Sequence, residues 1–359
     1  MDDFKSLFIR NLPLIDVRAP VEYSAGHFPG SVNLPLMLDE ERRQVGITYR
    51  EVGQAAALKL GHTLVCGKTK DERVSAWIEF LAQNPNAKLY CFRGGLRSQI
   101  SREWIEERCQ KSVEIIPGGY KALRRYLISS LESVTQTHPF LLLAGKTGCG
   151  KTEFLYRQNH PFLDLEKEAA HRGSSFGVQG TQPSQITFEN RLAVGLLKIN
   201  EGSTVLLEDE SVMIGQCVIP LVLFNQMRSS KLLVLERSLD DRADRIIQEY
   251  VLDRIRANPE NLESIHADLK TSLERISKKL GGVRFQEIGR LLDQAFLSKE
   301  ATYPSAHRSW VSSLLLDYYD PHYERALRKR EAQILVRGNE SELLEYLKSN
   351  LNASDGLSP

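Results

Sequence analysis

Two short segments of the chain combine residue types that bind anions with a side chain that can do chemistry. The first holds a cysteine, two glycines and two arginines, in the order Cys91, Arg93, Gly94, Gly95 and Arg97. The second reads Gly145-Lys-Thr-Gly148-Cys-Gly150-Lys151-Thr152. The first pattern is suited to a nucleophilic thiolate beside a bound anion, and the second to a phosphate group held by a lysine and backbone amides.

The cysteine segment lies between a short apolar run and a helical pattern. Lys88-Leu-Tyr predicts a strand that ends at Cys91, and a helix is expected to begin near Ser98. Amide groups of the glycine turn and the positive end of the helix stabilise both an anion and a thiolate, and Arg93 and Arg97 add fixed charge. We therefore expect Cys91 to be a nucleophile toward sulfur, selenium or phosphorus, and not a simple core cysteine.

The segment upstream of this loop resembles the opening of the rhodanese family. It runs from Leu14 to Pro35 and contains an Asp-x-Arg pair followed by Gly-His-x-Pro-Gly. In that family both stretches pack around the cysteine loop. We interpret Asp16, Arg18, Glu22 and His27 as a structural network of ion pairs and turn contacts, in preference to direct catalysts.

The spacing inside the loop differs from the usual sulfurtransferase pattern. Arg97 lies six residues after Cys91, which gives Cys-x5-Arg-Ser and a roomier loop. The same spacing occurs in cysteine-dependent phosphatases, so a phosphate-containing donor would fit. A phosphatase also needs an acid to protonate the leaving oxygen, and the sequence identifies none.

The second segment matches the Walker A spacing in full. His138-Pro-Phe-Leu-Leu-Leu-Ala predicts a buried strand before it, and Glu153-Phe-Leu-Tyr continues as a helix after it. Gly145, Gly148 and Gly150 let the backbone wrap a phosphate chain, Lys151 reaches the terminal phosphate, and the Thr152 hydroxyl is a candidate ligand for Mg²⁺. Cys149 is interpreted as a small filler within the loop.

A later strand, Ser203-Thr-Val-Leu-Leu, ends in three acids where a Walker B carboxylate is expected: Glu208, Asp209 and Glu210. Such acids hold metal-bound water or position a nucleophile. The sequence leaves open which of the three acts, and whether a metal binds. A following strand leads to Arg237 and Arg242, which are candidate phosphate contacts of the kind found in nucleoside kinases.

Composition places the chain among folded proteins. It has 359 residues, of which 42% are hydrophobic and 26% charged, and five cysteines without disulfide or zinc spacing. No apolar run is long enough for a membrane span, and the cysteines favour a reducing cytoplasm. The formal net charge of +1 neither demands nor excludes nucleic acid.

We predict an α/β protein of two domains. Residues 1–130 form the rhodanese-like domain, with a helical insertion over about 40–82. Residues 138–240 form a P-loop core with a parallel sheet, and 241–350 form a mostly helical C-terminal part.

A third stretch, Phe162 to Gly177, contains the candidate phosphate or RNA contacts His171, Arg172 and Ser174. Together with the cysteine loop and the P-loop, it resembles the tRNA 2-selenouridine synthases, a bacterial family in which a rhodanese domain is fused to a P-loop domain. The resemblance spans nearly the whole chain.

This resemblance implies a reaction at the wobble 2-thiouridine of tRNA. Its sulfur is geranylated from geranyl diphosphate and is then replaced by selenium from selenophosphate. In this scheme Cys91 carries selenium, while Arg93, Gly94, Gly95 and Arg97 hold selenophosphate. The P-loop, from Gly145 to Thr152, holds the diphosphate. The implied partners are tRNA and a selenophosphate synthetase.

Other functions remain open on the residues alone. A rhodanese–kinase fusion would combine sulfur transfer with nucleotide-dependent phosphoryl transfer, since ATP or GTP also fits a P-loop. An RNA-binding module without catalysis is disfavoured by Cys91, and a phosphatase is favoured only by the loop spacing. The sequence does not identify the tRNAs or the oligomeric state.

Overall fold

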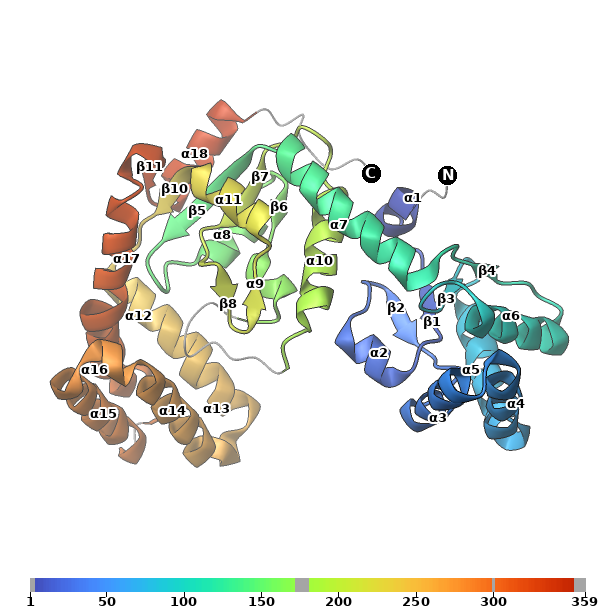
Figure 1. The fold of residues 1–359 in the computed structure, drawn as a ribbon. Helices are drawn as coiled ribbons and strands as arrows, with labels where there is room; N and C mark the ends of the chain where they lie inside the picture. Colours follow the sequence, from blue (N-terminus) through green and yellow to red (C-terminus); the bar gives the residue numbers. More distant parts are fainter. Residues whose placement is uncertain (1–3, 172–180, 299–300, 352–359) are drawn as a thin grey trace. The chain divides into compact units, whose positions relative to one another are not determined.

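The computed structural model describes residues 4–171, 181–298 and 301–351, which form two compact units (Figure 1). The first unit contains residues 1–134 and 183–198, and the second contains 135–182 and 199–359. Each unit has its own parallel sheet covered by helices, so the predicted α/β class is confirmed. By its contacts the segment Pro183–Lys198 is grouped with the first unit, whereas in sequence it falls within the range 138–240 that we predict as the P-loop core.

The sheet of the first unit has four parallel strands in the order β2-β1-β3-β4. Its strands are β1 (Leu14–Asp16), β2 (Ser31–Asn33), β3 (Lys88–Tyr90) and β4 (Glu114–Ile115). In the register Ile15 lies opposite Val32 on one side and Leu89 on the other. The central strands β1 and β3 are therefore buried, as their apolar residues require, and Cys91 follows β3 directly.

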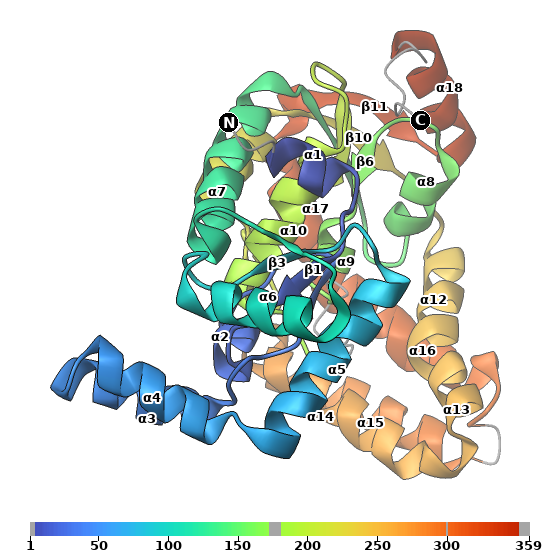
Figure 2. The ribbon, with the colours of Figure 1, turned by 90° about the vertical axis from the view of Figure 1, so that its right-hand side faces the viewer.

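Helices surround this sheet and extend away from it. They are α1 (Phe4–Ile9), α2 (Pro20–Ala25), α3 (Asp39–Glu51), α4 (Gln54–Leu64), α5 (Gly67–Gln83), α6 (Leu96–Cys109), α7 (Gly119–Thr137) and α10 (Gln185–Leu197). Helices α3, α4 and α5 fill the range in which we expected the helical insertion. Figure 2 shows α3 and α4 side by side, projecting from the rest of this unit.

The sheet of the second unit has five parallel strands in the order β11-β10-β5-β7-β6. They are β5 (Phe140–Gly145), β6 (Phe162–Leu163), β7 (Val205–Glu208), β10 (Lys231–Leu235) and β11 (Ile334–Gly338), while β8 (Met213–Ile214) and β9 (Cys217–Val218) form a separate antiparallel pair. All residues of β5 and β7 are buried. Because parallel strands end at one edge of the sheet, the loop after β5 and the acids at the end of β7 lie together.

The second unit also contains helices on the sheet and a larger helical part. They are α8 (Lys151–Arg157), α9 (Leu165–Glu168), α11 (Leu221–Ser229), α12 (Leu239–Ile247), α13 (Asp253–Ala257), α14 (Leu262–Leu280), α15 (Gly282–Leu297), α16 (Pro304–Leu314), α17 (Asp320–Arg328) and α18 (Glu340–Asn350). Two π-helical turns, Gln248–Leu252 and Leu315–Tyr319, connect α12 to α13 and α16 to α17. Residues from α12 to α16 share one apolar cluster around Trp310. Within the described ranges, no helix combines the length and the apolar character that a membrane span needs.

Candidate functional site

The cysteine loop is fixed by two glycines that face each other. Gly94 and Gly119 both have left-handed backbones, with φ of +65° and +55°. A Cβ atom added to Gly119 would lie 2.2 Å from the carbonyl oxygen of Cys91 and 2.5 Å from the amide nitrogen of Gly94. The amide of Tyr120 also donates to the Cys91 carbonyl at 2.9 Å. The first residues of α7 therefore clamp the backbone of the cysteine loop, and only glycine fits at the point of contact.

Cys91 lies at the base of this loop with its side chain largely buried, because the residue is only 3% exposed. Its Sγ atom is 3.9 Å from the carbonyl oxygen of Gly95. Ser98, in the first turn of α6, has a fully buried hydroxyl without a hydrogen-bond partner among the described residues. A buried donor without a partner is costly, so a bound anion at the start of α6 would gain a hydrogen bond there.

Arg97 is held by an acid that is far away in the sequence. Its guanidinium contacts both carboxylate oxygens of Glu22, at 2.6 and 3.2 Å. Arg42 approaches the same carboxylate at 3.0 Å. Burial opposes ionisation of Glu22, but the hydrogen bond and charge of Arg97 outweigh it and lower the pKa of Glu22. Arg97 is therefore oriented by Glu22, whereas Arg93 is exposed.

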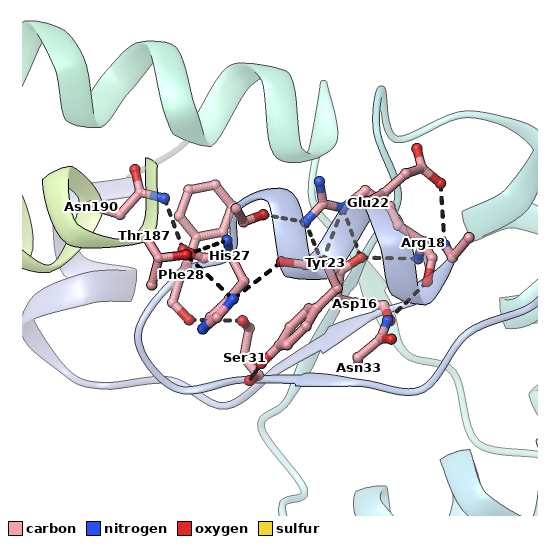
Figure 3. A network of polar contacts seen from close by, with 12 residues as sticks. Asp16, Arg18, Glu22, Tyr23, His27, Phe28, Ser31, Asn33, Thr187 and Asn190 are labelled. Carbon is pink, nitrogen blue, oxygen red and sulfur yellow. Dashed lines mark hydrogen bonds and ion pairs between the residues drawn. The ribbon is translucent and has the colours of Figure 1, made fainter. Parts of the chain in front are cut away.

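The upstream motif forms the structural network that we expected (Figure 3). Asp16 and Arg18 make a buried ion pair at 2.6 Å, and Arg18 also donates to the Gly26 carbonyl at 2.8 Å. The His27 ring stacks on Tyr23, with ring centres 4.2 Å apart, and burial lowers the pKa of His27. These contacts hold the turn between α2 and β2.

Helix α10 completes this network. The Asn190 side chain donates to the carbonyl of His27 at 2.8 Å, and the amide of His27 donates to the Thr187 hydroxyl at 3.1 Å (Figure 3). A Cβ atom on Gly26 would lie 2.6 Å from Ile186. The close approach of α10 therefore depends on a glycine in the motif.

The P-loop adopts the left-handed backbone conformations that its glycines predict. Gly148 and Gly150 have φ of +81° and +88°, and a Cβ atom on Gly145 would lie 2.5 Å from the Cys149 sulfur. Cys149 is buried, and burial raises the pKa of its thiol. It is therefore placed as the expected filler and not as a second nucleophile.

The three acids at the end of β7, the first of which is the last residue of the strand, have different surroundings. The Thr152 hydroxyl donates to Glu208 at 2.7 Å. Asp209 instead forms an ion pair with the buried Arg330 at 2.5 Å. Glu210 faces Glu208 and a third carboxylate, Glu166 from α9, and ligand oxygens of the three lie within 4.8 Å of one another. The geometry thus separates Asp209 from the other two acids.

The ionisable groups around Lys151 lie close together and shift one another's pKa values. Burial raises the pKa of Glu210 to about 8, opposed by Lys151 and reinforced by Glu166 and Glu208. Burial also raises the pKa of Glu208. Burial disfavours the Lys151 ammonium, but the surrounding thiol and carboxylates outweigh that effect and raise its pKa. Lys151 is therefore charged, and oxygen ligands of this kind suit Mg²⁺.

The two arginines that we predict as phosphate contacts, Arg237 and Arg242, form ion pairs with different acids in the structure. Arg242 is buried and pairs with Asp320 at 2.7 and 2.8 Å, and it also donates to the Thr147 carbonyl, so it supports the P-loop from below. Arg237 pairs with Glu340 at 3.1 Å. Arg245, one turn beyond Arg242, lies over Gly150: its guanidinium carbon is 3.1 Å from a Cβ atom added there.

His171 lines the P-loop pocket, and the other two predicted residues of its segment, Arg172 and Ser174, lie outside the described residues. Burial lowers the pKa of His171, and its Nδ1 atom is buried without a hydrogen-bond partner within the described ranges. The ring is therefore neutral near pH 7.

The pocket itself has a volume of about 710 Å³. It is bordered by the P-loop, by Glu166, Glu208 and Glu210, and by Arg245 and Tyr323. The sequence analysis did not propose Glu166, Tyr323 or Arg245 as site residues. Glu166 lies within the third stretch that it singled out, but only the tertiary fold brings this carboxylate to the P-loop pocket, and no motif marks the other two residues.

The chain matches two family descriptions. Residues 1–125 match the rhodanese-like domain, and residues 138–354 match the tRNA 2-selenouridine synthase AAA domain. Among curated proteins, the tRNA 2-selenouridine synthase of Marinobacter nauticus is 45% identical, with 97% of both chains covered. Those of Alcanivorax borkumensis and Pseudomonas aeruginosa are 42% and 44% identical, covering 97% and 96% of this chain and 98% and 96% of theirs.

Proposed function

Because this chain belongs to the tRNA 2-selenouridine synthase family, we propose that it replaces the sulfur of wobble 2-thiouridine in tRNA with selenium. One observation carries the proposal: a chain that matches this family from end to end places Cys91 in a clamped loop between a buried strand and a helix start. Such a junction favours a nucleophilic thiolate beside an anion.

In the selenium step, the Cys91 thiolate attacks the selenium of selenophosphate. An S–Se bond forms, the Se–P bond breaks, and its electron pair leaves on phosphorus as phosphite. The helix start, the Ser98 hydroxyl and Arg97 are the groups that support binding of the phosphoryl oxygens. Selenophosphate is supplied by a selenophosphate synthetase, and the reaction takes place in the cytoplasm, where thiols remain reduced.

The selenium on Cys91 then attacks C2 of an S-geranylated uridine. A C–Se bond forms, and the C2–S bond breaks with geranyl thiolate as the leaving group. An external thiol cleaves the S–Se bond, which leaves selenium on the base, and a second thiol restores Cys91 as the free thiolate. This order of steps explains why alkylation of the sulfur before selenation favours the exchange, because an alkylated sulfur is a better leaving group than the sulfur of a thiocarbonyl.

We place the geranylation step at the P-loop. The tRNA sulfur attacks C1 of geranyl diphosphate, the C1–O bond breaks, and diphosphate leaves while the base loses its N3 proton. Lys151, the amides after Gly148 and Arg245 are suited to stabilise the negative charge of diphosphate. Thr152, Glu166, Glu208 and Glu210 would hold Mg²⁺, which would neutralise the same leaving group.

A second function is favoured by one contact. The hydrogen bond from Thr152 to Glu208 is the arrangement in which P-loop enzymes hold Mg²⁺ for a nucleoside triphosphate. A rhodanese–kinase fusion would hydrolyse or transfer phosphate from ATP or GTP without tRNA.

Reconstitution with purified protein separates these functions. Anticodon stem-loop RNA carrying 2-thiouridine should become geranylated with geranyl diphosphate alone, and selenated when selenophosphate and a thiol are added. Mass spectrometry of the nucleosides follows both products. Nucleotide turnover without either modified nucleoside would reject the proposal in favour of the kinase fusion.

A further inference from the structure

A pocket of about 470 Å³ lies in the first unit, apart from the P-loop. Its walls come from the loop after β2, from α3 and α4, and from the first turns of α6. The apolar residues that line it are Leu36, Met37, Val45, Tyr49, Ala57, Leu58, Val65, Leu96, Ile100 and Trp104. The volume is in the range of small-molecule sites.

This pocket lies beside the cysteine loop. Leu36, Met37, Val65 and Trp104 line it and also belong to the same apolar cluster as Cys91. Leu96, which follows the loop directly as the first residue of α6, also lines the pocket and is 43% exposed. An apolar group seated there would therefore be close to the loop that carries Cys91.

Val45 of α3 and Leu64 of α4 pack against the core of this unit, but α3 also carries apolar surface that the core does not cover. Helix α3 contains no fully buried residue, and its Tyr49 is 57% exposed. Figure 2 shows α3 and α4 projecting from this unit. Exposed apolar side chains that converge on one hollow are typical of a binding site.

The pocket combines these walls with positive charge. Its lining includes Arg42, Arg43, Arg50 and Arg97 and no carboxylate, although Glu22 and Glu40 pair with three of these arginines from outside. Apolar walls with an arginine rim fit a ligand that joins a hydrocarbon chain to a polyanion. A free fatty or prenyl chain without phosphate would leave the rim unused.

We propose that this pocket holds the geranyl group of S-geranylated tRNA while selenium is delivered from Cys91. This inference rests on the proposed function, because it assigns a place to the leaving group of that reaction. The walls shield the ten-carbon chain from water, and Arg42, Arg43 and Arg50 contact the neighbouring RNA phosphates, while Arg97 remains with the selenium donor. Geranylation at the P-loop does not need this pocket.

The test measures binding of anticodon stem-loop RNA to the full chain. One RNA carries S-geranyl-2-thiouridine, a second carries a five-carbon S-prenyl group, and a third carries 2-thiouridine. Since each buried CH₂ changes affinity about fourfold, the geranyl RNA should bind at least about tenfold more tightly than the five-carbon RNA.

Gly46 offers a way to fill the pocket. It lies in α3, it lines the pocket, and a Cβ atom added there meets no atom within 4 Å. Gly46→Trp should abolish the advantage of the geranyl RNA, leave binding of the 2-thiouridine RNA within about twofold, and let geranylated RNA accumulate in the complete reaction. Gly282→Trp is the matched control, because Gly282 also has open space and lies outside the pocket.

A second variant shows whether the effect of the first arises from the pocket or from a folding defect. Tyr49→Glu changes an exposed side chain and should weaken only the geranyl RNA, since it places a carboxylate at the apolar wall. If both variants bind and selenate geranyl RNA as the wild type does, the pocket assignment is overturned while the proposed function stands. If both RNAs lose affinity equally, the pocket holds RNA and not the prenyl group. If the wild type acts on no RNA, the proposed function fails, and this inference fails with it.

Discussion

Cys91 and Lys151 occupy the same kind of position, between the end of a buried parallel strand and the first turn of a helix. At Cys91 the strand is β3 and the helix is α6, and at Lys151 they are β5 and α8. The neighbours differ: an arginine oriented by Glu22 accompanies the thiol loop, whereas three carboxylates surround the lysine. The first position therefore suits a soft nucleophile, and the second suits a diphosphate with a divalent cation.

Removing the Lys151 ammonium should separate the two steps. We expect Lys151→Ala to slow geranyl transfer at least about 100-fold, because it removes the main fixed charge on the leaving diphosphate. Selenation of RNA that already carries a geranyl group should be unaffected. Rates for both substrates, with Lys348→Ala on α18 as control, check this, and equal loss of both activities would contradict it.

Cation binding at the acids should depend on pH. Since the pKa of Glu210 is raised to about 8, this carboxyl is mostly neutral at pH 7 and must lose its proton to bind a metal. Apparent Mg²⁺ affinity should therefore rise up to about tenfold per pH unit below pH 8 and level off above it. Calorimetric titrations between pH 6 and 9 measure this. A Glu210→Gln variant should bind weakly with little pH dependence, and an unchanged slope in that variant would exclude Glu210 as the titrating ligand.

At the scale of elements, the features with local signals were predictable. The strand, glycine loop and helix start of both anion sites follow from apolar runs and glycine spacing, and the helices of the insertion follow from their periodicity. The grouping of α10 with the first unit was not predictable from the sequence. It depends on the packing of Ile186 against Gly26, and these two residues are far apart in the sequence. Only the tertiary fold brings Glu166 close to Glu208 and Glu210. The ion pair between Arg242 and Asp320 likewise joins residues that are distant in the sequence.

The start of α7 should control the conformation of the cysteine loop. Gly119→Ala places a methyl group against the Cys91 carbonyl at a left-handed position, which should destabilise the first unit by about 1–3 kcal/mol and slow selenation. Geranyl transfer should persist. Thermal melting and the two rates test this against Gly282→Ala, which has open space; a Gly119→Ala protein with normal selenation would show that the clamp does not position Cys91.

At the scale of the whole molecule, the proposed reaction has both loops act on one long polyanion, although the formal net charge of the chain is only +1. Binding therefore depends on local groups of arginine and lysine, and not on overall charge. The arginine rim of the pocket in the first unit is one such group.

Binding of tRNA should consequently weaken with salt. If about five phosphates are contacted, the logarithm of the binding constant should fall with the logarithm of salt concentration with a slope of about −4. Filter binding between 50 and 300 mM KCl, roughly the range over which such contacts are screened, measures the slope. A flat response would indicate an enzyme of small molecules.

The most direct test of the central claim is mass analysis of wobble nucleosides from cells that lack this protein. Both 2-selenouridine and S-geranyl-2-thiouridine should be absent, and 2-thiouridine should accumulate. Restoring the wild-type chain should return both nucleosides, while Cys91→Ser should return only the geranylated one and Cys66→Ser, at an exposed thiol, should return both. Persistence of 2-selenouridine in the deletion strain, or its return with Cys91→Ser, would contradict this account.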